Sequence, residues 1–133
     1  FDGKLAIVSD RSRLAAEYSL KTIFGYFDLN ASVFLEDERR EYAKPNPYAV
    51  KKAMAAMAAN SALYAGDSAE DLLMARRAEK EAGCKIAFVG IYGYSSEPRK
   101  AAAVLKKNGA DIVIKSANHL PALIRRRMHI PQA

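Results

Sequence analysis

The stretch Ala65-Gly66-Asp67-Ser68-Ala69-Glu70-Asp71 decides how this chain is interpreted. It follows a short apolar run and opens the strongest helical pattern in the sequence. A strand that ends at a Gly-Asp turn before a helix is the place where an open α/β sheet binds ligands. Asp67 and Asp71 lie within about one helical turn, so together they could hold a hard divalent cation such as Mg²⁺. Ser68 and Asp71 also form a capping box, which requires no metal.

The composition is that of one globular domain. The chain has 133 residues, of which 50% are hydrophobic and 27% are charged, as in ordinary soluble domains. No apolar run approaches the roughly 20 residues that span a bilayer, so we expect no membrane partner. Cys84 is the single cysteine, which excludes an internal disulfide and favours a reducing compartment. We expect a single domain over residues 1–133, located in the cytoplasm.

Apolar runs alternate with amphipathic segments along the whole chain. Continuous apolar runs predict buried strands over 4–9, 31–35, 62–65, 85–90 and 111–114. Helical periodicity predicts helices over 14–24 (ended by Gly25), 47–59, 69–82, 98–108 and 118–127. Strands that alternate with helices predict an α/β fold, a doubly wound parallel sheet of about five strands flanked by helices.

Three polar residues stand at or just beyond the predicted carboxyl ends of the first three strands, Ser9, Lys44 and Asp67. These strand ends share one edge of such a sheet. A hydroxyl, an ammonium group and a carboxylate at that edge suit a metal-bound phosphoryl group. Each residue also has an ordinary interpretation: Ser9 as a turn residue, Lys44 as a solvated lysine and Asp67 as a helix cap.

The net charge of +6 favours anionic partners, such as phosphate esters, nucleic acid or acidic surfaces. The clearest basic cluster is Arg125-Arg126-Arg127, which would form a nucleic-acid patch or, the interpretation we favour, complement the end of the last predicted helix. The aromatic residues are not interleaved with basic ones in a stacking pattern, so we do not expect a nucleic-acid partner. Such a partner would require a basic face whose binding depends steeply on salt.

The order of these motifs resembles a known family. Leu5-Ala6-Ile7-Val8-Ser9-Asp10, then Lys44-Pro45, then Gly66-Asp67-Ser68-x-x-Asp71 look like motifs two, three and four of the haloacid dehalogenase-like (HAD) hydrolases. The phosphoglycolate-phosphatase-like branch is the most similar. The resemblance covers nearly the whole chain and implies a Mg²⁺-dependent phosphatase that acts on a small phosphorylated substrate.

The resemblance also implies a role for each matching residue. Ser9 would hydrogen-bond the transferring phosphoryl group, and Lys44 would neutralise its charge and steady the nucleophile. Asp10 is counted with them as a phosphate-binding residue. Asp67 would help to hold Mg²⁺, and Asp71 would assist or orient the metal's ligands.

The family's first motif is absent. It is a strand that ends in Asp-x-Asp, whose first aspartate forms the aspartyl-phosphate and whose second is the general acid and base. Asp2-Gly3 stands too early to follow a strand, and Asp10-Arg11-Ser12 lacks the second aspartate. We therefore interpret the chain as a partial HAD core that lacks its first strand and shows no cap domain. Covalent catalysis needs the nucleophile, so this chain alone should be inactive.

Two arrangements would avoid an unfilled gap at the position of the missing strand. An N-terminal segment or a second chain would complete the sheet, which is the arrangement we favour. Alternatively, the strands at 5–8 and 62–65 would pair directly, in the flavodoxin-like order 2-1-3-4-5. The second arrangement would suit a non-catalytic α/β module that binds a phosphorylated ligand or a protein partner.

Overall fold

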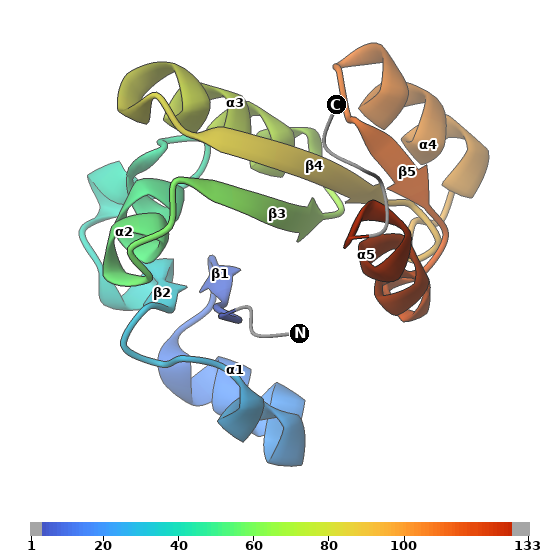
Figure 1. Cartoon of the computed structure of the whole chain (residues 1–133). Helices are drawn as coiled ribbons and strands as arrows, with labels where there is room; N and C mark the ends of the chain where they lie inside the picture. Colours follow the sequence, from blue (N-terminus) through green and yellow to red (C-terminus); the bar gives the residue numbers. More distant parts are fainter. Residues whose placement is uncertain (1–3, 129–133) are drawn as a thin grey trace. The chain divides into compact units, whose positions relative to one another are not determined.

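The computed structural model describes residues 4–128, with side chains for residues 4–126 (Figure 1). Asp2-Gly3 therefore lies outside the described residues. The regular elements are, in chain order, β1 (Val8–Ser9), α1 (Arg13–Leu20), η1 (Lys21–Tyr26), β2 (Val33–Phe34), η2 (Leu35–Asp37), η3 (Arg40–Tyr42), α2 (Tyr48–Ala56), β3 (Ser61–Gly66), α3 (Ala69–Ala82), β4 (Lys85–Ile91), α4 (Pro98–Lys107), β5 (Ile112–Ile114), η4 (Ala117–His119) and α5 (Leu120–Met128).

The strands form two sheets. β1 and β2 pair in parallel, with Val8 opposite Val33. The other sheet has the order β3-β4-β5, and β4 runs parallel to β5 with Val89 opposite Ile112. This α/β architecture with parallel strands and flanking helices confirms the predicted fold class.

Two compact units can be distinguished, and each has its own packing. The N-terminal unit comprises Phe1–Ala62 with Leu73–Ile86, and the C-terminal unit comprises Leu63–Leu72 with Ala87–Ala133. Within the N-terminal unit, Ala16, Phe24 and Phe34 form a buried cluster. α2 packs against β1 and β2 and buries four side chains, namely Ala49, Val50, Ala53 and Met54.

The C-terminal unit is organised around β4. Its residues from Phe88 to Ile91 are buried, as its continuous apolar sequence predicts. The rings of Tyr64 and Phe88 meet edge to face with centroids 5.6 Å apart. α4 packs against β5 and buries Leu105. This packing fixes the carboxyl end of β3, where the turn to α3 begins.

The observed elements differ from the predicted ones mainly near the N-terminus. The strand predicted over 4–9 is assigned only at Val8–Ser9, although the backbone N–H of Val33 still donates to the carbonyl of Ile7 at 2.8 Å. The helix predicted over 14–24 ends at Leu20, because Lys21 adopts a positive φ of 50°. Gly25 therefore lies inside η1 and does not end the helix. The helix predicted over 69–82 is confirmed as α3.

Candidate active site

The turn between β3 and α3 holds Asp71 in a closed hydrogen-bond arrangement. Asp71 is only 4% exposed. Its Oδ1 accepts a hydrogen bond from the hydroxyl of Tyr64 at 2.9 Å, and its Oδ2 accepts one from the hydroxyl of Ser68 at 2.9 Å. The backbone N–H of Asp71 donates in return to Ser68 Oγ at 3.2 Å. The capping box predicted from the sequence is therefore formed, and it satisfies a buried carboxylate.

Gly66 allows this arrangement because it has no side chain. A Cβ placed on Gly66 would lie 2.8 Å from both Cβ and Oδ2 of Asp71. These distances are shorter than van der Waals contact, so any larger residue would displace the Asp71 carboxylate. The Gly-Asp turn is thus required sterically, and this requirement explains why strand β3 ends in glycine at the start of the site.

Asp67 has a different environment from Asp71, since its side chain is exposed at the start of the turn. It lines an open pocket of about 230 Å³ within the C-terminal unit. The pocket's polar side chains are Asp67, Ser95, Glu97 and Lys100, and its apolar ones belong to Ala69, Ala101, Val104 and Leu105. The exposed carboxylate of Asp67, beside a pocket, can contact a cation or a substrate. The carboxylate of Asp71 is buried and therefore less accessible to either.

Ser9, Asp10 and Lys44 gather in the N-terminal unit. Ser9 ends β1, and its Oγ accepts a hydrogen bond from the backbone N–H of Arg11 at 3.1 Å. This bond leaves the hydroxyl hydrogen of Ser9 able to donate. Lys44 Nζ lies 4.0 Å from Asp10 Oδ2, and the Lys44 side chain is only 12% exposed. The structure thus brings Asp10 and Lys44 together, although they are distant in sequence.

Lys44 is held by the segment that leads into α2. The carbonyl of Pro45 accepts a 3.5 Å hydrogen bond from Arg77, and Asn46 Oδ1 accepts one from the backbone N–H of Tyr48 at 2.9 Å. Asn46 therefore caps the start of α2, as its side-chain type predicts. These contacts fix the backbone on the C-terminal side of Lys44.

Sequence reasoning missed several residues around the carboxylates. The sequence pattern places Tyr64 in a strand and assigns it no other role, yet its hydroxyl donates a hydrogen bond to Asp71. The signal was weak: a tyrosine in a buried strand needs a partner for its hydroxyl, but the sequence does not identify that partner. Ser95, Glu97 and Lys100 come from a distant loop and helix, and no spacing in the sequence links them to Asp67.

A short ion pair of the N-terminal unit involves none of these groups. Lys52 Nζ is 2.6 Å from Glu38 Oε1, and the hydroxyl of Tyr48 donates to Glu38 at 3.2 Å. The Lys52 hydrogen bond holds the pKa of Glu38 below its ordinary value, and the same bond raises the pKa of Lys52. Within residues 4–128 there is no cluster of three or more His, Cys, Asp or Glu side chains that could hold a metal ion by itself.

The comparisons with known proteins identify the family. A family model for haloacid dehalogenase-like hydrolases matches residues 2–79, which is more than half of the chain. The chain belongs to the HAD-like hydrolases. The matched range includes both HAD-like residue groups described above, the one around Ser9 and Lys44 and the one at the Gly66–Asp71 turn. No curated protein matches the chain.

Two crystal structures share the HAD-like fold with this chain. One is a conserved haloacid dehalogenase-like protein of unknown function from Agrobacterium tumefaciens, with a TM-score of 0.74 and 20% identity. The alignment covers 97% of this chain and 57% of that protein. The other, a Northeast Structural Genomics Consortium target, has a TM-score of 0.73 and 19% identity, with 38% of its chain covered by 94% of this one. The chain thus spans little more than half, or less, of these structures.

No helix within residues 4–128 combines the length and the apolar character needed to cross a membrane.

Proposed function

We propose that this chain is the C-terminal portion of a Mg²⁺-dependent phosphatase of the phosphoglycolate-phosphatase-like branch. It would act on a small phosphate ester through an aspartyl-phosphate intermediate. The observation that carries the proposal is the family match over residues 2–79, which contains Ser9, Lys44, Asp67 and Asp71. The mostly buried side chain of Lys44 supports it further, because a phosphate-binding ammonium group acts most strongly where water is partly excluded.

In this proposal the N-terminal unit binds the phosphoryl group. The hydroxyl of Ser9 donates to a phosphoryl oxygen, and the backbone N–H of Asp10 is a second donor at the same strand end. The ammonium group of Lys44 offsets the negative charge that the phosphoryl group and the nucleophile carry. Asp10, 4.0 Å from Lys44, orients that ammonium group.

The turn between β3 and α3 supplies the oxygen ligands that Mg²⁺ prefers. Mg²⁺ is usually bound by one or two carboxylates together with water and substrate phosphate, so a cluster of three acidic side chains is not required. Asp67, which is exposed beside a pocket, fits a direct ligand. Asp71, whose two oxygens accept hydrogen bonds from Tyr64 and Ser68, fits a positioning role that holds the turn. When bound, the cation would neutralise charge on the phosphoryl group.

The nucleophilic aspartate would come from outside this chain, because no Asp-x-Asp occurs in the sequence. We propose an N-terminal segment, or a second chain, that adds a strand carrying this motif. Among the described residues β1 is paired with β2 and β3 is paired with β4, so each of these strands has an edge to which another strand could add. Unpaired strand edges are sites where another strand adds through backbone hydrogen bonds.

The test uses the polypeptide as its source organism makes it, with its intact mass measured first. We expect a mass well above the 14.6 kDa of this chain and hydrolysis of p-nitrophenyl phosphate that stops when EDTA removes Mg²⁺. A preparation that binds phosphate esters but never releases p-nitrophenol, with or without Mg²⁺, would overturn the proposal. That result would instead favour a non-catalytic α/β module.

A further inference from the structure

The positive charge of the chain is concentrated at its C-terminal end. The whole chain carries +6. Residues 98–133, which begin with α4, contain eight basic residues and a single acidic one, Asp111, so the preceding residues are close to neutral. The carboxylate of Asp111 accepts a hydrogen bond from the backbone N–H of Phe88 at 2.7 Å. It is therefore engaged within the fold, and the segment over residues 98–133 carries a local excess of cations.

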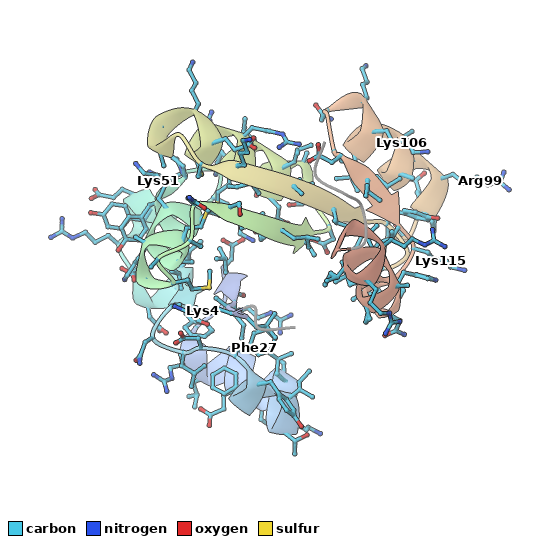
Figure 2. The ribbon with its side chains drawn as sticks, viewed as in Figure 1. Lys4, Phe27, Lys51, Arg99, Lys106 and Lys115 are labelled. Atoms are coloured by element: carbon cyan, nitrogen blue, oxygen red, sulfur yellow. The ribbon has the colours of Figure 1, made fainter. Side chains whose placement is uncertain are left out.

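Six of these cations are exposed and have no partner for their charged groups among the described residues, namely Arg99, Lys106, Lys107, Lys115, Arg125 and Arg126. We call Arg99, Lys106, Lys107 and Lys115 the basic surface. None of them makes an ion pair or a side-chain hydrogen bond with the residues that the structure describes. Figure 2 shows that the side chains of Arg99, Lys106 and Lys115 extend away from α4 and from the end of β5.

Several basic residues of the N-terminal unit have partners for their charged groups. Lys51 pairs with Glu81 at 3.0 Å, and Lys52 pairs with Glu38 at 2.6 Å. Lys4 donates to the carbonyl of Met57 at 3.0 Å. Other exposed cations of this unit have no such partner among the described residues either, namely Arg13, Lys21, Arg40, Lys80 and Lys85. The basic surface differs because three of its cations lie on α4 and the fourth directly follows β5, so neighbouring elements present them to an external anion.

The cations of the basic surface are held by regular elements at a spacing that suits successive phosphate groups. Arg99 and Lys106 are seven residues apart in α4, so they lie on the same side of the helix about 10 Å apart. α4 packs against β5, which leads directly to Lys115. The helix and the strand end therefore present these cations in a fixed arrangement.

An exposed aromatic side chain contacts Ser116, the residue that follows Lys115. Tyr94 is 70% exposed, and its hydroxyl lies 3.5 Å from Ser116 Oγ. Gly93 holds this contact: its backbone N–H donates to the carbonyl of Lys115 at 2.9 Å, and a Cβ on Gly93 would lie 2.9 Å from Lys115 Cγ. The fold thus brings the segment of Tyr94 to the segment that carries Lys115, which is distant in sequence, and this is why the sequence shows no interleaving of aromatic and basic residues.

We propose that the basic surface and Tyr94 bind single-stranded RNA. Cations that follow the phosphate backbone, together with an exposed aromatic ring on which an unstacked base can lie, are the two elements of single-strand recognition. An anionic membrane fits less well, because Tyr94 and Val104 are the only large apolar side chains that are strongly exposed among the described residues of this unit. The proposal does not depend on phosphatase activity.

Fluorescence anisotropy of a labelled oligouridine strand tests the proposal with the full chain. We expect binding whose logarithm falls with the logarithm of salt concentration at a slope near −3, about −0.7 for each of four phosphate contacts. The double variant Arg99→Glu with Lys106→Glu should reduce the slope to about −1.4 and weaken binding at least tenfold. Tyr94→Ala should weaken binding about tenfold while leaving the slope unchanged.

Lys51→Glu is the matched control, since it reverses the charge of an exposed lysine outside the basic surface. It should change the affinity less than twofold. Absence of binding would overturn the proposal, as would an equal loss of affinity in Lys51→Glu. Binding to phosphatidylserine vesicles without binding to oligouridine would also overturn it and would assign the basic surface to membranes.

Discussion

The two groups of site residues differ in what holds them in place. At the β3–α3 turn, Asp71 is bonded to Ser68 and Tyr64, all within eight residues of one another, and Gly66 provides the space for its carboxylate. Lys44 and Asp10 instead come from distant parts of the chain and lie 4.0 Å apart. The turn is a local structure whose loss should mainly cost stability, whereas the Lys44 group should mainly affect the reaction. The variants below test that division.

The largest effect should come from Lys44→Ala in the catalytically complete polypeptide. Removing a cation that stabilises developing charge should lower kcat by about 10²–10³-fold. Steady-state kinetics with p-nitrophenyl phosphate measures this change, and Lys51→Ala, at an exposed lysine paired with Glu81, serves as its control. A kcat within a factor of two of the unsubstituted enzyme would remove Lys44 from the site.

Gly66→Ala should destabilise the chain by about 1–3 kcal/mol, because the new Cβ would overlap the Asp71 carboxylate. Urea denaturation followed by circular dichroism measures the free energy of unfolding. Gly25→Ala is the matched control, since a Cβ on Gly25 would meet no atom within 4 Å. Equal effects of the two substitutions would show that the contact with Asp71 is not the cause.

Ser68→Ala should cost about 1–2 kcal/mol of unfolding free energy. It removes both the acceptor for the backbone N–H of Asp71 and a donor to its buried carboxylate. Ser12→Ala sharpens the comparison, because Ser12 caps α1 at Ala15 by a hydrogen bond of 3.1 Å but supports no buried carboxylate. We expect the loss at Ser68 to exceed the loss at Ser12, and the reverse order would contradict the role given to Asp71.

The smallest effect concerns the Glu38–Lys52 pair, which lies outside both groups. The pKa of Glu38 is lowered in the folded state, mainly by its hydrogen bond with Lys52. Ionised Glu38 therefore contributes stability at pH values above the ordinary carboxyl pKa of about 4.3. That contribution is lost as the pH falls through the lowered pKa. Glu38→Gln should therefore reduce stability by less than about 1 kcal/mol at neutral pH and have no effect in stronger acid. Urea denaturation across this pH range measures the difference, and a constant difference would exclude an ionic origin.

The sequence predicted the local features better than the distant ones. The capping box of Ser68 and Asp71, the helix at Ala69–Ala82 and the buried strand β4 depend on neighbouring residues, so spacing and side-chain type were sufficient. The contacts of Tyr64 with Asp71 and of Tyr94 with Ser116 depend on packing between elements. The end of α1 was placed too late because Lys21, an ordinary helix former, adopts a positive φ there.

The roles of Asp67 and Asp71 give the account its most direct test. In the catalytically complete polypeptide, activity is measured as a function of Mg²⁺ concentration for Asp67→Asn and for Glu70→Gln, which removes a neighbouring exposed carboxylate in the first turn of α3. We predict that Asp67→Asn raises the Mg²⁺ concentration needed for half-maximal activity at least tenfold, whereas Glu70→Gln leaves it unchanged. An unchanged Mg²⁺ requirement in Asp67→Asn would contradict the assignment of this turn as the metal site of a HAD-like phosphatase.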